Sequence, residues 1–183
     1  MKKRRIKKIV FVCTGNTCRS PMAEMLLKRE IERLKLKNVK ALSAGLKAKN
    51  GDSMNLKSAQ TLINKGIAFD EFVSKKVNKK LLLESFAIVC MTEKQKEILM
   101  ELRWKALREA GEEKIENNVY SFFELVGYEI LDPYGRDLSC YEYVFQLLEG
   151  GMSALIEKLL PANEREYVGE TKKRTYKKRR EII

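Results

Sequence analysis

Two residues near the amino terminus, Cys13 and Arg19, have types and a spacing that could do chemistry on a phosphate group. They are the ends of the segment Cys13-Thr14-Gly15-Asn16-Thr17-Cys18-Arg19. A tight loop of this length can turn several backbone N–H groups inward, where they bind the oxygens of an anion. Gly15 lets the backbone approach that anion closely. The segment therefore predicts a phosphate-binding loop.

Arg19 and Cys13 would divide the work within this loop. The planar guanidinium can donate two parallel hydrogen bonds to phosphate oxygens, which a lysine could not do. This contact stabilises the phosphoryl group most as charge shifts in the transition state. The same positive surroundings favour an anion at Cys13, so we expect a thiolate that acts as the nucleophile.

The loop also has plainer interpretations. Cys13 could be an ordinary cysteine at a strand end and Arg19 an ordinary helix residue, although the glycine and asparagine between them argue against this. Cys13 and Cys18 make a poor zinc site because the chain has no histidine and no second cysteine pair. We expect no metal and no cofactor. Cys18 either forms a reversible disulfide with Cys13 under oxidation or is a small packing residue.

The residues around the loop predict the elements that position it. Lys8 to Cys13 is a nearly continuous apolar run, which is typical of a buried parallel strand. A helix should begin at Arg19, with Ser20 as a possible cap and Pro21 suited to the first turn. A second strand over residues 39–44 would complete a right-handed β–α–β unit.

The alternation of strands and helices continues along the chain. We expect further strands at 86–91 and 118–122, and further helices at 56–65, 78–84, 92–110 and 138–160. Gly150 and Gly151 fall inside the last helix, where we expect a kink or a close packing contact. This order predicts an α/β fold, a single doubly wound domain with a central parallel sheet flanked by helices. Ligands bind at strand carboxyl ends in that architecture, which is where the Cys13 loop would lie.

Composition and charge limit the remaining possibilities. With 183 residues, 44% hydrophobic and 34% charged, the chain should form one soluble globular domain over 1–160. We expect residues 161–183 to be a mobile basic tail. Much of the net charge of +12 lies in Lys2–Lys8 and Lys172–Arg180, and such runs are usually solvated chain ends. Tyr176 is their one interleaved aromatic residue, so nucleic-acid binding is unsupported.

Location and assembly can be predicted only broadly. The apolar run Ile9–Val12 is too short for a signal-peptide core, and no stretch approaches the roughly 20 apolar residues that span a bilayer. We therefore expect a cytoplasmic chain, without a membrane partner, whose four cysteines are reduced. The oligomeric state is not determined by the sequence, and a monomer is assumed.

Three segments together resemble one protein family. The segment 13–21, C-x5-R-S-P next to the amino terminus, closely resembles the signature of the low-molecular-weight protein tyrosine phosphatase family. Ser43-Ala44-Gly45 is similar to the short second-strand motif of that family, and Asp132-Pro133-Tyr134 to its general-acid loop. The resemblance covers roughly residues 7 to 160. It implies a metal-independent phosphatase that acts on phosphorylated proteins.

The resemblance also implies roles for single residues. Cys13 would form a phosphocysteine, Arg19 would clamp the phosphate, and Asp132 would protonate the leaving group and then activate a water. An Asp-Pro pair is also a common turn, so Asp132 could be a turn residue only. The remaining positions would bind or support the phosphate: Thr14, Gly15, Asn16, Thr17, Cys18, Ser20, Tyr134 and the supporting residue Ser43. Ser20 could donate to the Cys13 sulfur, whereas Asn16 with Ser43 could pin the loop.

Thr17 bears most on the substrate. Tyrosine-directed members of the family commonly have a bulkier aliphatic residue at the matching position, while a threonine resembles the protein-arginine-phosphatase members. A hydroxyl there could bind a polar guanidinium, whereas an aliphatic wall better suits a phenyl ring. Tyr134 could stack on either substrate. Arg136 and Asp137 depart from the arginine-directed pattern.

These residues lead us to expect hydrolysis of phosphoarginine in proteins, with phosphotyrosine as the alternative. Arsenate reduction is a weaker alternative, because the related reductases need a closely spaced cysteine pair and Cys90 and Cys140 are far apart. A non-catalytic phosphate-binding module is the last alternative. The presence of Cys13, Arg19 and Asp132 together argues against it.

Overall fold

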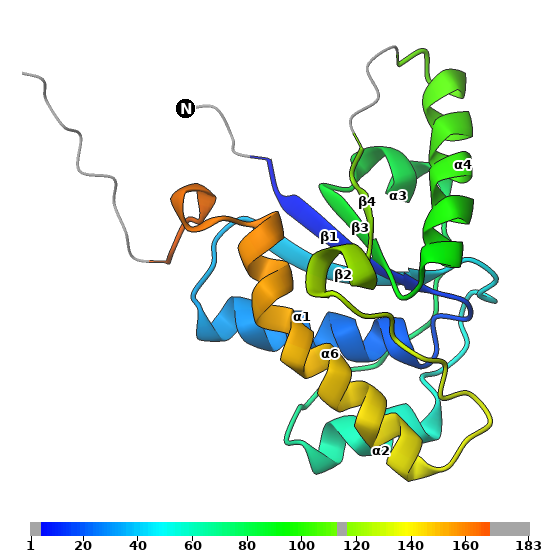
Figure 1. Ribbon diagram of the computed structural model, residues 1–183, viewed down its shortest axis with the longest axis vertical. Helices are drawn as coiled ribbons and strands as arrows, with labels where there is room; N and C mark the ends of the chain where they lie inside the picture. Colours follow the sequence, from blue (N-terminus) through cyan, green and yellow to red (C-terminus); the bar gives the residue numbers. More distant parts are fainter. Residues whose placement is uncertain (1–4, 113–116, 169–183) are drawn as a thin grey trace, which may run out of the picture.

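The computed structural model describes residues 5–112 and 117–168 of the chain. Its elements follow in the order β1 (Lys7–Cys13), α1 (Arg19–Arg33), β2 (Val39–Gly45), α2 (Leu56–Asn64), α3 (Lys79–Glu84), β3 (Ala87–Cys90), α4 (Glu93–Glu109), β4 (Val119–Ser121), α5 (Phe122–Val126), α6 (Leu138–Leu159) and a 3₁₀ turn at Ala162–Glu164 (Figure 1). Every predicted strand and helix is present, with its predicted boundaries within one residue. The short helix α5 was not predicted.

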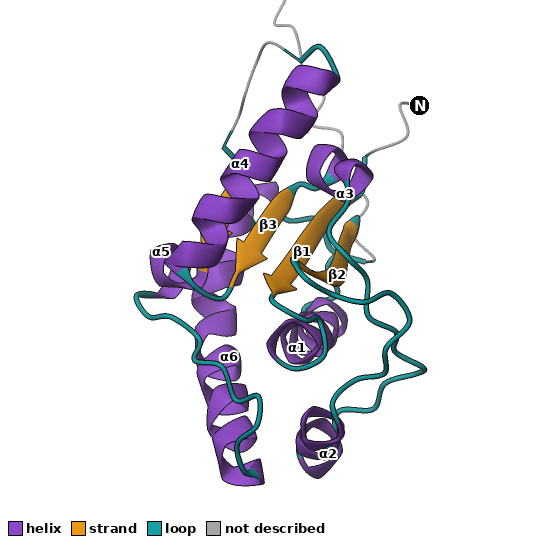
Figure 2. Cartoon of the chain, turned by 90° about the vertical axis from the view of Figure 1, so that its right-hand side faces the viewer, coloured by secondary structure: helices purple, strands orange, loops and turns teal. Residues whose placement is uncertain are grey.

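The four strands form one parallel sheet in the order β2-β1-β3-β4. Helices α1 and α6 cover one face, and α3 and α4 cover the other (Figure 2). This arrangement confirms the predicted doubly wound α/β fold with a central parallel sheet. Because all strands run in one direction, their carboxyl ends meet at one edge, where Cys13 pairs with Gly45.

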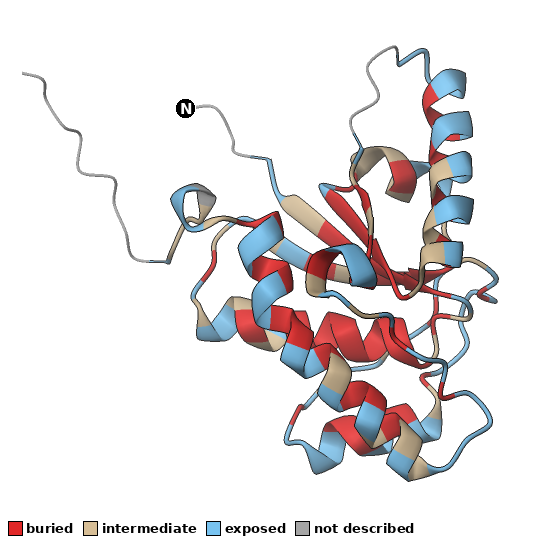
Figure 3. Cartoon of the chain, viewed as in Figure 1, coloured by how far each residue is buried: buried red, intermediate tan, exposed pale blue. Residues whose placement is uncertain are grey.

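Strand β1 lies in the middle of the sheet and is buried on both faces. Ile9 and Phe11 pack into the core under α1 and α6, while Val10 and Val12 pack into the core under α3 and α4. All four are at most 1% exposed. Burying a side chain of this size stabilises the fold by about 1.5–3 kcal/mol. The continuous apolar run thus reflects a strand with two apolar faces, and Figure 3 shows α1 buried alongside it.

The expected cap of α1 is wrong. The helix begins at Arg19 with Cys18 as its N-cap, and no side chain caps it. Ser20 is the second helical residue, and its hydroxyl lies 3.0 Å from the sulfur of Cys13 instead. The Ser20 hydroxyl therefore faces the loop and does not cap the helix.

The glycine pair leaves α6 uninterrupted from Leu138 to Leu159. A Cβ atom on Gly151 would lie 2.8 Å from Cε1 of Phe122 and 3.0 Å from the hydroxyl of Tyr128. Of the two expectations, the close packing contact is therefore confirmed. Gly150 has much more room, since the nearest atom to its added Cβ would be 3.8 Å away.

The chain continues to pack beyond residue 160, where we expected the domain to end. The Lys37 N–H donates to the carbonyl of Glu166 at 2.5 Å, and the Val168 N–H donates to the carbonyl of Lys35 at 2.7 Å. The basic run at 172–180 lies outside the described residues. Among the described residues, no helix is long and apolar enough to cross a membrane.

Candidate active site

The Cys13 sulfur lies at the carboxyl end of β1, and the residue is 3% exposed. The backbone N–H of Asn16 donates to it at 3.3 Å, and the Ser20 hydroxyl lies 3.0 Å away. Ser20 has one hydrogen to give and can also reach the carbonyl of Ala44 at 3.3 Å. An ionised sulfur only accepts hydrogen bonds, so it would draw that hydrogen. Both groups can donate to the sulfur that the sequence predicted as the nucleophile.

Asn16 holds the loop in place. It is fully buried with a left-handed backbone (φ 55°), which asparagine tolerates better than most residues. Its side-chain amide donates to the hydroxyls of Ser20 and Ser43, both at 2.9 Å. Its amide oxygen accepts the N–H of Lys75 at 2.8 Å. The structure thus brings the predicted residues Asn16, Ser20 and Ser43 together, and ties the loop to β2 and to a distant segment.

Gly45, the pairing partner of Cys13, leaves no room for a side chain. A Cβ atom there would lie 2.8 Å from both the Asn16 nitrogen and the Thr14 carbonyl oxygen. Both are backbone atoms of the loop from Cys13 to Arg19. A larger residue at position 45 would therefore displace the loop itself.

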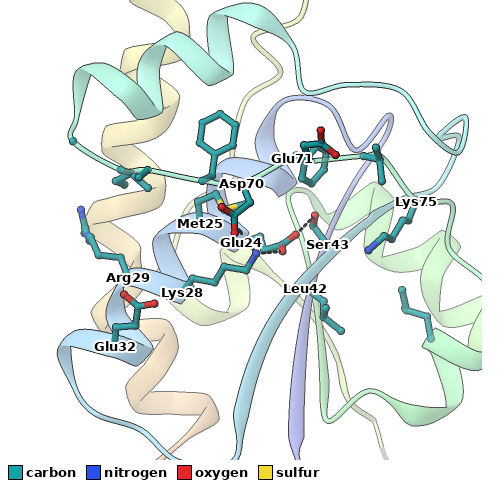
Figure 4. Close-up of a pocket in the computed structure, with 17 residues that line it drawn as sticks. Glu24, Met25, Lys28, Arg29, Glu32, Leu42, Ser43, Asp70, Glu71 and Lys75 are labelled. Atoms are coloured by element: carbon teal, nitrogen blue, oxygen red, sulfur yellow. Dashed lines mark hydrogen bonds and ion pairs between the residues drawn. The ribbon is translucent and has the colours of Figure 1, made fainter.

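A buried carboxylate that the sequence reasoning missed extends this network. Glu24 on α1 is 8% exposed and accepts the Ser43 hydroxyl hydrogen at 2.5 Å. It also forms an ion pair with Lys28 at 2.7 Å. Figure 4 shows Glu24 between these two partners, at the wall of a cavity of about 610 Å³. An acidic residue within the apolar run 22–27 was the signal for such a role.

Replacing Glu24 by alanine should lower kcat about tenfold, which corresponds to about 1.4 kcal/mol in the activation barrier. The Ser43 hydroxyl would lose its acceptor and hold Asn16 less firmly. We expect Ser43→Ala to lower kcat by a similar factor. The double variant should lower kcat little further, because both residues act through the same series of hydrogen bonds to Asn16. Steady-state kinetics on the three variants checks this. Glu32→Ala is the matched control, because Glu32 is an exposed carboxylate at the same cavity. If the losses in kcat of Glu24→Ala and Ser43→Ala were fully additive, the two residues would not act through the same hydrogen bonds.

Arg19 is 3% exposed and points across the end of the sheet. Its Nη1 donates to the carbonyl of Ile130 at 3.1 Å, and its Nη2 forms an ion pair with Oδ2 of Asp132 at 2.5 Å. Its Nε is buried without a hydrogen-bond partner. An unpaired buried donor costs about 1–3 kcal/mol, so an anion that accepts from it would stabilise the site.

Asp132 and Tyr134 come from the segment between α5 and α6. The Asp132 side chain is 50% exposed, and its Oδ1 accepts the Tyr134 N–H at 3.2 Å. Asp132 is therefore a turn residue, as the plainer interpretation had it, and also lies against Arg19. The Tyr134 residue is 73% exposed and is free to pack against a bound group.

A cavity of about 400 Å³ joins these residues. It is lined by Cys13, Thr14, Gly15, Thr17, Cys18, Arg19, Lys47, Lys49, Asp52, Asp132 and Tyr134. The sequence reasoning missed Lys47, Lys49 and Asp52. They follow the carboxyl end of β2, and the Lys47 N–H donates to the carbonyl of Thr14 at 2.8 Å. Pairing of β2 beside β1 was the signal that could have found them.

Cys18 lies in the wall of the same cavity. Burial raises the pKa of its thiol, so it stays protonated at neutral pH. Its sulfur is 3.7 Å from both the Thr17 and the Tyr141 hydroxyls. A disulfide with Cys13 stays a prediction. Within residues 5–112 and 117–168, no group of three or more histidine, cysteine or acidic side chains could hold a metal ion.

Several known proteins are similar to this chain in sequence. The sequence model described as low molecular weight phosphotyrosine protein phosphatase matches residues 8–165. The chain is 32% identical over 154 residues to a protein-arginine-phosphatase of Bacillus subtilis, covering 82% of this chain and 95% of the relative. It is 27% identical over 154 residues to the probable low molecular weight protein-tyrosine-phosphatase EpsP of Ralstonia nicotianae, covering 84% and 97%.

Solved structures agree with the sequence matches. A YwlE arginine phosphatase, a cysteine-to-serine mutant with a phosphorylated active-site serine, superposes with a TM-score of 0.73 at 30% identity, covering 85% of this chain and 97% of that one. A low molecular weight protein tyrosine phosphatase from T. tengcongensis superposes with a TM-score of 0.70 at 28% identity, covering 83% and 99%. The chain therefore belongs to the low molecular weight phosphotyrosine protein phosphatase family.

Proposed function

We propose that this phosphatase hydrolyses phosphorylated proteins through a phosphocysteine formed at Cys13. One observation carries the proposal. The buried Cys13 sulfur, the guanidinium of Arg19 and the carboxylate of Asp132 line one cavity, although Asp132 is far away in the sequence. A nucleophile, a phosphate clamp and an acid are the three groups that the reaction needs.

In the first step the Cys13 thiolate attacks the phosphorus. A P–S bond forms while the bond from phosphorus to the leaving nitrogen or oxygen breaks, and the leaving atom takes a proton from Asp132. The phosphate competes with Asp132 for the Nη2 of Arg19. Once released from this ion pair, the Asp132 carboxyl can hold the proton that the leaving group requires.

In the second step a water molecule attacks the phosphocysteine. Asp132, now ionised, takes a proton from the water as the P–S bond breaks and its electron pair returns to Cys13. Inorganic phosphate then leaves. The loop N–H groups and Arg19 stabilise the charge on the phosphoryl oxygens in both transition states.

Phosphoarginine is the substrate that we propose. The carboxylates of Asp52 and Asp132 and the Thr17 hydroxyl line the cavity and can bind a cationic guanidinium. The basic residues of the same lining, Arg19, Lys47 and Lys49, suit its phosphoryl group. The relatives include proteins named as arginine phosphatases. Neither Arg136 nor Asp137, which depart from the arginine-directed pattern, lines the cavity. Asp137 instead caps α6 by accepting the Cys140 N–H at 3.1 Å.

Phosphotyrosine is the second candidate, supported by the exposed Tyr134 ring and by the tyrosine-directed relatives. A cytoplasmic location and a monomeric state stay predictions.

Comparing kcat/KM for a phosphoarginine protein and a phosphotyrosine peptide tests the choice of substrate. We expect wild type to prefer phosphoarginine. Thr17→Ile should lower kcat/KM for phosphoarginine by about 10-fold or more, the scale of discrimination that one pocket contact gives. The same variant should leave phosphotyrosine turnover unchanged or faster, because the isoleucine offers an apolar wall. A wide preference of wild type for phosphotyrosine would overturn the arginine assignment while leaving the cysteine mechanism intact.

A further inference from the structure

A second cavity, of about 520 Å³, lies at the opposite end of the sheet from Cys13. It is lined at the amino ends of three strands by Lys7, Ala87 and Asn118, the end away from the arrowheads in Figure 2. We call it the amino-end cavity. It shares no residue with the cavity at Cys13. Its size is in the range of small-molecule sites.

Arg103, in the middle of α4, is the unusual residue of this cavity. It is only 9% exposed, and its Nη1 donates to the carbonyl of Leu82. Its Nε is buried with no hydrogen-bond partner. In the part of the chain that the structure describes, no carboxylate forms an ion pair with it. Burial accordingly lowers the pKa of Arg103.

An arginine cannot escape this cost by losing its proton, because a guanidinium is not deprotonated in proteins. A buried charge without a counter-ion is destabilising, and an added anion would offset that cost. The acidic residue that lines the cavity, Glu84, is already paired with Lys8 at 2.7 Å. No carboxylate among the described residues therefore offsets the charge of Arg103, and an anion in the cavity would do so.

The rest of the lining also suits an anion. Arg5, Lys7 and Lys158 line the cavity together with Arg103, so basic residues outnumber the acidic one by four to one. Lys158 donates to the neutral carbonyl of Glu124 at 3.0 Å and has no ion-pair partner among residues 5–112 and 117–168. Electrostatic attraction would concentrate anions here.

Two aromatic side chains and an unpaired hydrogen-bond acceptor also line the cavity. Phe86 and the half-buried Tyr120 both line it, and Nζ of Lys7 lies over the Phe86 ring at 4.8 Å, so Tyr120 is the aromatic surface left for a ligand. The side-chain oxygen of Asn118 is buried without a partner, while its amide donates to the carbonyl of Ser85 at 2.8 Å. An aromatic surface next to a free acceptor suits a flat ring that carries an N–H group.

We propose that the amino-end cavity binds a nucleotide-like small organic phosphate, with its phosphate on Arg103 and its ring against Tyr120. This site is separate from the catalytic one and does not depend on the proposed reaction. The phosphate supplies the charge that Arg103 lacks, and the ring accounts for the apolar part of the lining.

Titration of the ¹⁵N-labelled full chain with AMP, followed by NMR, tests the proposal. We expect AMP to shift the amides of 86–87 and 118–120 in addition to any shift in the Cys13–Arg19 loop, so that the two sites are read separately. Arg103→Gln should weaken binding at the amino-end cavity at least tenfold. Inorganic phosphate and adenosine, which each lack one half of the ligand, should both bind there more weakly than AMP.

Arg108→Gln is the matched control, because Arg108 is exposed on the same helix and lies over the Trp104 ring at 5.7 Å. It should leave AMP binding unchanged. If Arg103→Gln fails to fold, Lys158→Gln on the exposed side of α6 replaces it, with an expected weakening of at least twofold. Shifts confined to the catalytic loop, equal binding of AMP and phosphate, or unchanged affinity in the tested variant would overturn the proposal.

Discussion

Replacing Cys13 by serine should lower kcat by about 10⁴-fold or more, the scale of loss seen when the nucleophile of a covalent mechanism is removed. A serine hydroxyl holds its proton far more tightly than a thiol does, so Asn16 and Ser20 would no longer face an anion. Steady-state turnover of a phosphorylated protein measures the loss. Phosphate binding, measured by calorimetry, should survive because Arg19 and the loop remain.

Cys140→Ser is the matched control for this variant, since Cys140 lies on α6 and does not line the catalytic cavity. It should keep wild-type kcat. EDTA should also leave turnover unchanged, because no step of the proposed mechanism uses a metal. Turnover within tenfold of wild type in Cys13→Ser would exclude Cys13 as the nucleophile.

Asp132→Ala should lower kcat for phosphoarginine or phosphotyrosine by about 10²–10³-fold, within the usual range for a general acid. These leaving groups need a proton as the bond to phosphorus breaks. With p-nitrophenyl phosphate, whose leaving group departs readily as an anion, the loss should be much smaller. Binding of phosphate should be kept or tightened, because Arg19 loses its ion pair with Asp132 and can turn wholly to the ligand.

Asp52→Ala serves as the control here, since Asp52 is the other carboxylate of the cavity and has no acid role in the mechanism. Its kcat should fall less than tenfold with either leaving group. Equal losses of Asp132→Ala on good and poor leaving groups would remove Asp132 from the acid role and leave it as a turn residue.

Much of the fold was predictable because local chemistry and burial agree. The run at 9–12 is apolar throughout since β1 packs on both faces. Thr92 and Asn78 begin α4 and α3 by accepting backbone N–H groups, as helix caps do. In such segments a residue's type already reflects its final surroundings.

The predictions that the structure contradicts fail for a different reason. Local rules make Ser20 a helix cap, which is wrong because a tertiary contact overrides them. Its contact with the Cys13 sulfur, which the family resemblance predicted, is present. We expected a strand through Phe122, where α5 begins. Its capping box, Ser121 with Glu124, was readable, but Tyr120 and Phe122 favour a strand in isolation.

The residues of the candidate site also divide into those that the sequence predicts and those that it does not. Cys13 and Arg19 could be predicted because one loop holds both. Glu24 and Asp52 were not predicted, because their roles depend on contacts between elements, for which the sequence offered only indirect signals. The role of Asp132 was predicted only through the family resemblance. Its contact with Arg19 joins two residues that are 113 positions apart in the sequence.

Trapping the phosphoenzyme tests the central claim most directly. Asp132→Ala should slow hydrolysis of the intermediate, whereas p-nitrophenyl phosphate should still form it readily because its leaving group needs no proton. The intermediate should therefore accumulate when p-nitrophenyl phosphate is added to this variant. The mixture is quenched, digested and analysed by mass spectrometry. The mechanism predicts one phosphoryl group on the sulfur of Cys13. A phosphoryl group on another residue, or continued turnover with Cys13 never modified, would contradict it.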